Sequence, residues 1–585
     1  MKIKLLVILF LLIAVPCFSA TYYIRTDGHD TASGANNTTD GTTGAWLTVQ
    51  HAADTMVAGD TVNIANGTYD ANVTISTSGT VGNVITYIGA STAAYINGKI
   101  SVTANYITLD TLKIANTDCP TDYSNWYQCP AIDILGTASN GTVQNCLFDP
   151  GATIDGPYGS NIYFEGTNND SWTIQDNTFQ NMNYIKGIVR FNDTSDSITV
   201  SGNTFVTTWD CDVFYMNGNN NTISGNNISA NVLYRTDAQH SDVMQIMADY
   251  VTNIATNVIF EKNYVHDTDT NIFYSNRDPG LPTGVHDITF RNNIFANVTG
   301  EFRCSLPNIF IYNNVFYNCG TDYDYTIQIG GAQEQYDNTG LAIINNIFVS
   351  NNSRVWVENS NGYDAYTHTN NYYGNLSYAS NGSYAHGGNT TPITEATGVF
   401  GGNVYFVNRA GGDYTITNTG SVVSNVGAPL AAVTEDYAAA VRSNPPEIGP
   451  YEIGGASDTT APTLSNLLPS GTVAYAATKL LEVTSSADSS TECRYHATET
   501  VWASMTKMTT TDLSGGTHSQ TVNTSASTAY TYNILCRDAA ANESLAGTIT
   551  FTTTGNTPAP TGCTLDAAGA GSIGLGSGGS FVLSN

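Results

Sequence analysis

Two short segments in the middle of the chain contain the residues best suited to acid–base chemistry. The first contains Asp210 and Asp212, and the second contains Asp237, His240 and Asp242. Histidine gains or loses a proton near neutral pH, so His240 could act as a general base or acid beside these carboxylates. Glycoside hydrolysis also needs two carboxyl groups, one as acid and one as base or nucleophile. These five residues are the predicted catalytic group.

Asp212 and Asp242 each stand two residues before an apolar-x-apolar triplet, and Asn271 has the same place before a third triplet. If the triplets stack, the three side chains form a column. Neighbouring carboxylates repel each other, which raises the proton affinity of one of them or favours a cation such as Ca²⁺. A Ca²⁺ site of Asp212, Asp242 and Asn271 is therefore predicted. The alternative, a column of corner residues with no role beyond the fold, stays open for Asp212. Function is favoured for His240 and Asp242, because the chain has only 9 histidines.

The triplets are the elements that would position these residues. Their middle residues run from 133 to 356 in eight steps, about 28 residues apart, which suits one coil of a β-solenoid. The middle residue of each triplet points away from the core, so these residues should form one outward column with a spacing of about 4.8 Å. The column consists of Asp133, Tyr163, Arg190, Tyr215, Gln245, Tyr274, Arg303, Gln328 and Trp356.

Aromatic rings, arginine and glutamine at this spacing suit a linear glycan, because rings stack on sugar faces and the polar groups bind hydroxyls. The predicted substrate-binding residues are Arg190, Tyr215, Gln245, Tyr274 and Arg303. An ordinary sheet face, where tyrosine and glutamine are common, is the alternative.

A second repeat, apolar-x-x-Asn-x-apolar, follows each triplet at intervals of roughly 21 to 37 residues. Its short runs are rich in β-branched and aromatic residues and end in Gly or Asn, which predicts strands. Its asparagines, expected to stack as an amide ladder, are Asn177, Asn203, Asn226, Asn263, Asn293, Asn314 and Asn346. A further polar column follows four residues later in several coils, at Asn181, Asp267, Asn297, Asn318 and Asn375.

With these two columns in phase, the chain resembles the right-handed parallel β-helix proteins of the pectate-lyase-like superfamily over roughly residues 21–455. The resemblance implies an all-β solenoid, and the helical spacing of residues 46–56 predicts a helix that caps its first coil. The superfamily includes lyases, hydrolases, epimerases, tailspikes and adhesins, so the resemblance implies a fold and leaves the activity open.

Composition changes near residue 456, where a Gly- and Thr-rich linker begins. Short alternating strands then follow to about residue 555, which is typical of a small β-sandwich. This stretch resembles bacterial fibronectin type III-like modules at residues 458–463, 492–495, 530–532 and 536–542. Residues 556–585 are Gly, Ser, Ala and Thr-rich and are predicted to be disordered.

Residues 1–19 have the features of a secretory signal peptide: Lys2 and Lys4, an apolar run from Leu5 to Val15, and a small residue, Ser19, at the expected cleavage point. We therefore predict export, with residues 20–455 as the β-helix and 456–555 as the sandwich. A lipoprotein site at Cys17 is the competing interpretation. No other run is long enough to span a bilayer.

Removal of the signal leaves nine of the ten cysteines, and export permits disulfides. Plausible pairs are Cys119 with Cys129, Cys304 with Cys319, and Cys493 with Cys536; in the fibronectin-like resemblance the last pair would join facing strands.

Acidic residues outnumber basic ones by 49 to 19, giving a formal net charge of -30. Nucleic acids and anionic membranes demand cationic surfaces and are therefore poor partners. The function predicted is an exported carbohydrate-active protein that binds, and cleaves as a lyase or glycoside hydrolase, an extracellular polysaccharide. The polygalacturonase pattern is missing, and the segment around His240 is only loosely similar to the Asp-Pro-His-Asp motif of mannuronan epimerases. A non-catalytic glycan-binding or adhesive surface protein is the alternative.

Overall fold

A computed structural model describes residues 19–117, 130–151, 162–183, 187–191, 194–209, 212–232, 241–248, 254–277, 284–304, 306–320, 325–329, 339–350, 355–359, 367–375, 395, 397–416, 420–453, 461–485, 492–508, 510–511, 517–537 and 543–555. The chain divides into two compact units, residues 1–456 and 457–585. Each unit is described by itself.

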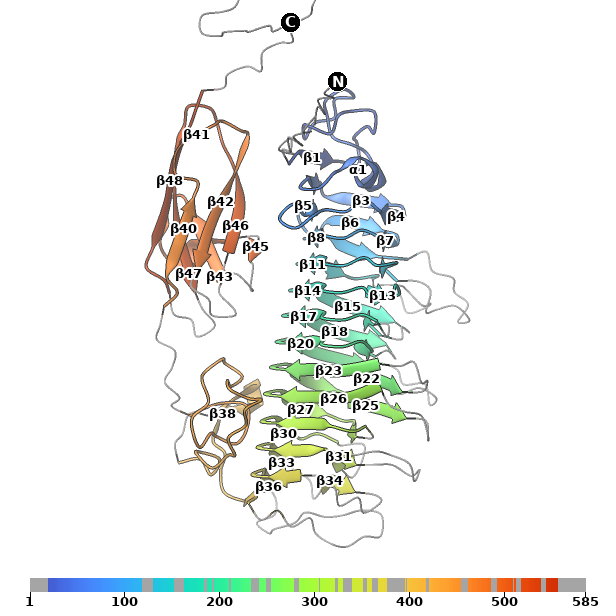
Figure 1. Ribbon diagram of the computed structural model, residues 1–585, viewed down its shortest axis with the longest axis vertical. Coiled ribbons are helices and arrows are strands. Elements are labelled where there is room, and N and C mark those ends of the chain that lie inside the picture. Colours follow the sequence, from blue (N-terminus) through green and yellow to red (C-terminus); the bar gives the residue numbers. More distant parts are fainter. Residues whose placement is uncertain are drawn as a thin grey trace, which may run out of the picture. The chain divides into compact units, whose positions relative to one another are not determined.

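The first unit is a right-handed parallel β-helix. Successive strands leave one sheet, pass through the other two and return beside their predecessors (Figure 1). Three long parallel sheets result, called here sheets A, B and C. The predicted solenoid is thus confirmed. No helix among the described residues is long and apolar enough to cross a membrane.

Sheet A contains, in spatial order, β1 (Thr21–Ile24), β2 (Thr61–Ile64), β5 (Ile85–Gly89), β8 (Ile107–Asp110), β11 (Thr142–Gln144), β14 (Thr173–Gln175), β17 (Thr199–Ser201), β20 (Thr222–Ser224), β23 (Ile254–Glu261), β26 (Gly284–Arg291), β29 (Ile309–Tyr312), β32 (Ala342–Ile344) and β35 (Thr367–Thr369).

Sheet B contains β3 (Gly67–Asp70), β6 (Ala94–Asn97), β9 (Lys113–Ala115), β12 (Leu147–Phe148), β15 (Thr178–Asn183), β18 (Thr204–Trp209), β21 (Asn227–Val232), β24 (Tyr264–Thr268), β27 (Ile294–Val298), β30 (Val315–Tyr317), β33 (Ile347–Ser350), β36 (Tyr372–Asn375) and β37 (Val399–Phe400).

Sheet C contains β4 (Val73–Ile75), β7 (Ile100–Val102), β10 (Ile132–Ile134), β13 (Ile162–Phe164), β16 (Val189–Arg190), β19 (Phe214–Met216), β22 (Asp242–Ala248), β25 (Asn271–Arg277), β28 (Phe302–Cys304), β31 (Tyr325–Ile329) and β34 (Val355–Asn359).

The core fills the space between the three sheets with one layer of apolar side chains per coil. Phe179 of β15 stacks on Phe148 at 4.5 Å between ring centroids and on Phe205 at 4.8 Å. Further along the same sheet, Phe316 stacks on Phe295 and Phe348, at 5.0 Å in each case. No coil can cover its own apolar face, so the stacking of coils supplies the burial that stabilises the unit.

The predicted asparagine column is a continuous hydrogen-bonded ladder between sheets A and B, here called the Asn ladder. In Asn263, Oδ1 accepts from the backbone N and from Nδ2 of Asn226, both at 2.9 Å. Its Nδ2 donates to Asn293 Oδ1 at 3.1 Å and to Ile223 O at 3.0 Å. The same pattern continues to Asn371, so each buried amide is satisfied by the coils on both sides.

The second predicted column is also confirmed in part. Asn297 Nδ2 donates to Asp267 Oδ1 at 2.8 Å, and Asn318 Nδ2 donates to Asn297 Oδ1 at 3.1 Å. Asn181 bonds instead to Asp149. These four column residues, Asn181, Asp267, Asn297 and Asn318, have positive φ between 48° and 57°, a conformation that Asn and Asp tolerate better than other non-glycine residues. The corner turn therefore selects the residue type.

The predicted cap is present as α1 (Val49–Thr55). Thr48 is its N-cap, with a side chain that accepts a hydrogen bond from His51 N. Val49, Ala52 and Ala53 are buried, and the fully buried Trp46 precedes the helix. The helix thus covers apolar side chains at the first coils, as expected for a solenoid terminus.

The end of the first unit folds back on the solenoid through β38 (Phe406–Asn408), η2 (Arg409–Gly411), β39 (Asp413–Ile416) and the segment 420–453. Asn345 of the solenoid exchanges two 2.8 Å hydrogen bonds with the backbone of Ala428. Buried Arg442 pairs with Glu452 at 2.8 Å and donates to Asn292 Oδ1 at 2.6 Å. The segment therefore packs along the corner beside the Asn ladder.

The second unit is a small β-sandwich, as predicted. One sheet contains β40 (Leu464–Leu468), β42 (Thr478–Ser485), β46 (Thr517–Asn523) and β45 (Thr510–Thr511). The other contains β41 (Gly471–Val473), β48 (Gly547–Thr553), β47 (Ala529–Arg537), β43 (Glu492–His496) and β44 (Thr506–Lys507), and η3 (Trp502–Ser504) lies between β43 and β44 in the chain.

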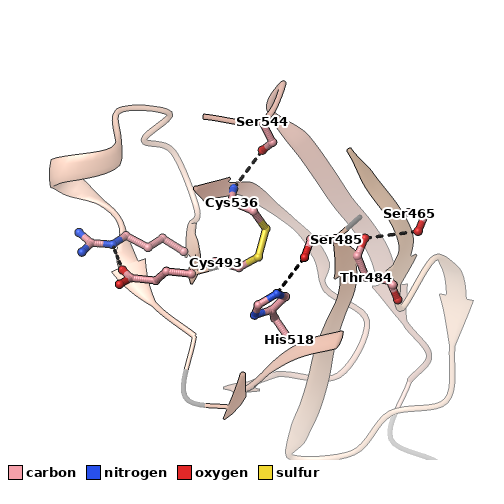
Figure 2. Close-up of a disulfide and its surroundings, with 9 residues drawn as sticks. Ser465, Thr484, Ser485, Cys493, His518, Cys536 and Ser544 are labelled. Carbon is pink, nitrogen blue, oxygen red and sulfur yellow. Dashed lines mark hydrogen bonds and ion pairs between the residues drawn. A yellow bond between two sulfur atoms is a disulfide. The ribbon is translucent and has the colours of Figure 1, made fainter. Parts of the chain in front are cut away.

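A disulfide joins Cys493 of β43 to Cys536 of β47, which are direct partners in the sheet (Figure 2). Cys536 N donates to Ser544 Oγ at 3.0 Å, and buried His518 lies 3.1 Å from Ser485 Oγ in the same region (Figure 2). This predicted pairing is confirmed.

The predicted pairing of Cys304 with Cys319 is wrong. Cys319 has a free, buried thiol, and its Sγ lies 3.4 Å from Phe295 O inside the solenoid core. Cys146 is also free, and burial raises the pKa of both thiols to about 12, so they act as small apolar side chains. Cys119 and Cys129 lie outside the described residues.

Candidate functional site

The outward column of sheet C has the predicted register over eight strands. Asp133 lies beside Tyr163, Tyr163 beside Arg190, and Arg190 beside Tyr215. Tyr215 then pairs with Gln245, and Gln245 with Tyr274. Arg303 and Gln328 are partners on the next two strands. We call these eight residues the sheet C stripe; strand pairing brings them together as the sequence predicted.

The column differs from the prediction at its last strand. Val355 pairs with Tyr325 and Val357 with Ile327, so Trp356 does not lie beside Gln328. The neighbour of Gln328 is Glu358. The apolar-x-apolar pattern fits two registers that differ by two residues, and the prediction that Trp356 belongs to the column was wrong.

Arg190 lies at the centre of an aromatic cluster on the stripe. Its guanidinium carbon is 4.4 Å from the ring centroid of Tyr163 and 5.5 Å from that of Tyr215. It forms no ion pair with any carboxylate among the described residues. Arg303, in contrast, pairs with buried Glu301 at 2.5 Å while it lies 5.0 Å from the Tyr274 ring. Arg190 therefore keeps its donors available to a ligand held against the two tyrosines.

Exposure varies along the stripe. Tyr163, Arg190, Tyr274 and Arg303 are half-buried, whereas Tyr215 and Gln245 are only 8% and 6% exposed. Part of the cover over Tyr215 is the guanidinium of Arg190. One buried polar atom on the same face lacks a hydrogen-bond partner: among the described residues, no donor bonds to Gln328 Oε1.

Three charged residues gather at the other end of the stripe, from the strands that precede Arg190. Lys99 Nζ lies 3.2 Å from Asp133 Oδ2, and Glu165 follows directly after β13. Burial, and then the nearby charge of Glu165, raise the pKa of Asp133 to about 6, although Lys99 acts in the opposite direction. Sequence reasoning placed Asp133 in the column but missed Lys99 and Glu165, because they stand just outside their triplets.

Asp212, Asp242 and Asn271 lie one above another on successive coils, as predicted. Asp242 N donates to Asp212 Oδ1 at 3.0 Å, and Asn271 Nδ2 donates to Asp242 Oδ1 at 2.7 Å. Asn271 Oδ1 accepts in turn from Glu301 N at 3.3 Å. The exposed fractions of Asp212, Asp242 and Asn271 are 6%, 0% and 2%. The three residues thus form a corner ladder beside sheet C, like the Asn ladder.

This corner ladder suits a cation poorly. Asn271 directs its amide N–H toward Asp242, where a Ca²⁺ ligand would have to present oxygen. Among the described residues, no group of three or more His, Cys, Asp or Glu side chains is placed to hold a metal ion. The catalytic roles of Asp212 and Asp242, and the Ca²⁺ site of Asp212, Asp242 and Asn271, stay predictions. Asp210, Asp237 and His240 lie outside the described residues.

The three sheets and their coil-by-coil register define the class: the first unit is a right-handed parallel β-helix. No protein-family model matches the chain, and no curated protein is significantly similar to it.

Solved structures give loose matches. A complex of XylC with xylose has 11% identity and a TM-score of 0.43, and the match covers 74% of this chain and 98% of that one. Pectate lyase Pel9A has 13% identity and a TM-score of 0.37, covering 74% and 97%. A PL6 alginate lyase complexed with trisaccharide has 16% identity and a TM-score of 0.35, covering 56% and 82%. With TM-scores below 0.5, these matches carry no argument about activity here.

Proposed function

We propose that this protein is exported, binds a linear extracellular polysaccharide along the sheet C stripe, and cleaves the bound chain by lyase-type or hydrolase-type chemistry. The observation that carries the proposal is Arg190, held between the rings of Tyr163 and Tyr215 without a carboxylate partner among the described residues. In a chain with 49 acidic and 19 basic residues, a cation beside aromatic rings that no carboxylate of the described residues pairs with supports a role in ligand binding.

The chemistry of the stripe supports a sugar ligand. The ring of Tyr163 offers an apolar surface to a sugar face, and the Arg190 guanidinium offers several N–H donors to hydroxyl or carboxylate oxygens. Strand pairing repeats such positions about every 4.8 Å along the solenoid, so a chain of sugars would meet equivalent groups in succession. A nucleic acid would instead meet a strongly acidic protein.

Export is proposed from residues 1–19 alone, because the charged start, the apolar run and the small residue at position 19 are the features of a signal peptide. The N-terminal sequence of the protein recovered from culture medium tests it. A mature N-terminus at Ala20 is expected; an intact Met1 in the cell fraction would contradict it.

Binding is tested with a panel of neutral and acidic oligosaccharides, measured by calorimetry for the wild type, Arg190→Ala and Arg25→Ala. Arg25 lies near the cap, is half-buried and pairs with Asp27, so its loss makes the same change in net charge away from the stripe. We expect Arg190→Ala to lose affinity by about 10- to 100-fold, as for an anchor residue, and Arg25→Ala to bind as the wild type does. Equal losses in both variants would contradict a site on the stripe.

Turnover is tested on the same panel by the release of reducing ends and by the ultraviolet absorbance of unsaturated uronates, which separates hydrolysis from β-elimination. His240→Ala examines the catalytic role predicted from the sequence. Binding by the wild type without turnover would favour the non-catalytic alternative, which the corner ladder of Asp212 and Asp242 also favours, since both carboxylates accept hydrogen bonds that hold coils together.

A further inference from the structure

Lys99, Asp133 and Glu165 form a cluster that the predicted catalytic group does not include. They belong to three neighbouring strands of sheet C: Lys99 directly precedes β7, Asp133 is the middle residue of β10, and Glu165 directly follows β13. The side chain of Asp133 is 4% exposed and that of Lys99 is 33% exposed. Glu165 is exposed and lies within hydrogen-bonding reach of Asp133.

The two oxygens of Asp133 have different surroundings. Oδ2 forms the 3.2 Å ion pair with Lys99, whereas buried Oδ1 accepts no hydrogen bond from any described residue. A buried carboxylate oxygen without a donor is costly, and a proton shared with a second carboxyl group removes that cost. Glu165 is the carboxyl group that lies close enough to share it.

The charge balance also favours one retained proton. Lys99 supplies one positive charge for two carboxyl groups, and two adjacent carboxylates cannot both ionise freely. The other stripe neighbours of Asp133 are uncharged: Ser101 pairs with it from β7 and Tyr163 from β13. Arg190 lies one strand further, over the Tyr163 ring. Burial, and then the charge of Glu165, accordingly raise the pKa of Asp133 to about 6.

We propose that Glu165 is the proton donor to the glycosidic oxygen of the bound polysaccharide, with Asp133 and Lys99 as positioning residues that keep the donated proton on the pair. Tyr163 is the middle residue of β13 and Glu165 directly follows that strand; Tyr163 is half-buried and Glu165 is exposed, so both side chains reach the surface of the solenoid. A sugar stacked on Tyr163 and bound by Arg190 thus places an adjoining glycosidic bond near Glu165. This inference rests on the proposed function.

For hydrolysis the step balances without another reagent. The bond between the anomeric carbon and the glycosidic oxygen breaks, and its electron pair stays on the oxygen, which takes the proton from Glu165. A water oxygen then bonds to the anomeric carbon and gives its surplus proton to solvent. Solvent then returns a proton to the pair of Glu165 and Asp133. Until it does, the positive charge of Lys99 stabilises the additional negative charge on the two carboxylates. Asp133, whose pKa is about 6, retains the proton beside the donor below that pH, so the rate should fall as pH rises through about 6.

The test uses the full-length protein and the polysaccharide that the panel identifies, with kcat and affinity measured from pH 4 to 8 in the variants Glu165→Gln, Asp133→Asn and Asp149→Asn. Asp149 is the matched control, because it forms a Lys–Asp pair with Lys113 across neighbouring coils, at 3.4 Å, outside sheet C. We expect Glu165→Gln to lower kcat by about 10²- to 10⁴-fold with little change in affinity. Asp133→Asn should shift the alkaline limb of the pH profile, and Asp149→Asn should leave both kcat and profile unchanged.

Several results would overturn the inference. Retained kcat in Glu165→Gln would do so, as would a pH limb that Asp133→Asn leaves in place. Loss of turnover in His240→Ala, with Glu165→Gln still active, would transfer the chemistry to His240. Binding by the wild type without turnover would remove the proton donor and leave glycan binding intact. No binding and no turnover on any polysaccharide would remove the proposed function as well.

Discussion

The Asn ladder and the sheet C stripe are both columns of polar residues with one member per coil, but they differ in where their hydrogen bonds go. Asn263 in the ladder uses its amide oxygen and nitrogen on the two neighbouring coils. On the stripe, Arg190 has no carboxylate partner, and Asp133 Oδ1 has no donor, among the described residues. The Asn ladder satisfies its own polar groups and so stabilises the fold. The sheet C stripe leaves polar groups without partners among the described residues, and such groups can bind a ligand or a proton.

The largest effect should come from a ladder residue. Asn263→Ala removes four hydrogen bonds: it leaves the backbone N of Asn226 without this acceptor in a buried site, removes the Asn263 Oδ1 acceptor from Asn226 Nδ2, and removes the side-chain donor from Ile223 O and Asn293 Oδ1. We expect the free energy of unfolding to fall by at least about 3 kcal/mol, since each unmet buried group costs about 1–3 kcal/mol. Urea denaturation followed by circular dichroism measures the loss.

Asn257→Gly is the control for that variant. Asn257 donates to Asn220 at 2.8 Å in an exposed position, and glycine tolerates its φ of 53°. Its loss should be below about 1 kcal/mol. Similar costs for the two variants would mean that burial of the Asn ladder is not what stabilises the coils.

The stripe should tolerate the equivalent change. Arg190→Ala removes cation–π contacts with half-buried Tyr163 and buried Tyr215 but leaves no buried charge behind. We expect the free energy of unfolding to change by no more than about 1 to 2 kcal/mol, while affinity for the glycan falls as described above. Thermal unfolding and calorimetry on one preparation measure both. Loss of the fold in this variant would mean that Arg190 stabilises the coils, as the Asn ladder does, and is not reserved for a ligand.

The Lys99–Asp133 and Lys113–Asp149 pairs should make the free energy of unfolding depend on pH in opposite directions. Burial and Glu165 raise the pKa of Asp133, so the folded state holds its proton more tightly than the unfolded state. Stability then falls as pH rises from about 4 to about 6. Asp133→Asn should therefore stabilise the protein above pH 6, by about 1 to 2 kcal/mol after allowance for screening at Lys99, and should have little effect below pH 4.

Asp149 should show the reverse sign. Burial acts to raise its pKa, but hydrogen bonds from Asn181 and Gly151 outweigh burial and hold the pKa below its usual value. Its carboxylate contributes stability above the unfolded pKa, and that stability is lost as pH falls. Asp149→Asn should thus destabilise the protein at neutral pH, by less than about 1 kcal/mol. Urea titrations at several pH values measure both variants; a common sign would contradict the distinction between the two pairs.

The sequence predicted the columns because each depends on a repeat that strand pairing must follow. Asn177 through Asn346 and the stripe from Asp133 to Gln328 each recur once per coil at the same place beside the apolar residues, so a register that aligns the apolar residues of successive coils also stacks these residues. The Trp356 position failed because alternation alone permits a slip of two residues. The disulfide at Cys493 could be predicted from the sandwich pattern, whereas the free state of Cys319 depends on which way its thiol points. Glu165 and Lys99 could not be found from the repeat, since they meet Asp133 only through the neighbouring strands.

The smallest expected effect distinguishes the two interpretations of Asp212. An asparagine at this position retains an oxygen that can accept from Asp242 N, just as the Asn ladder does elsewhere. If Asp212 serves only the corner ladder, Asp212→Asn should change the free energy of unfolding by less than about 0.5 kcal/mol and leave glycan turnover at the wild-type rate. If the carboxylate takes part in catalysis, turnover should fall although the fold is retained. Urea denaturation and the reducing-end assay on the same variant therefore decide whether Asp212 belongs with the ladder or with the groups that the stripe leaves available.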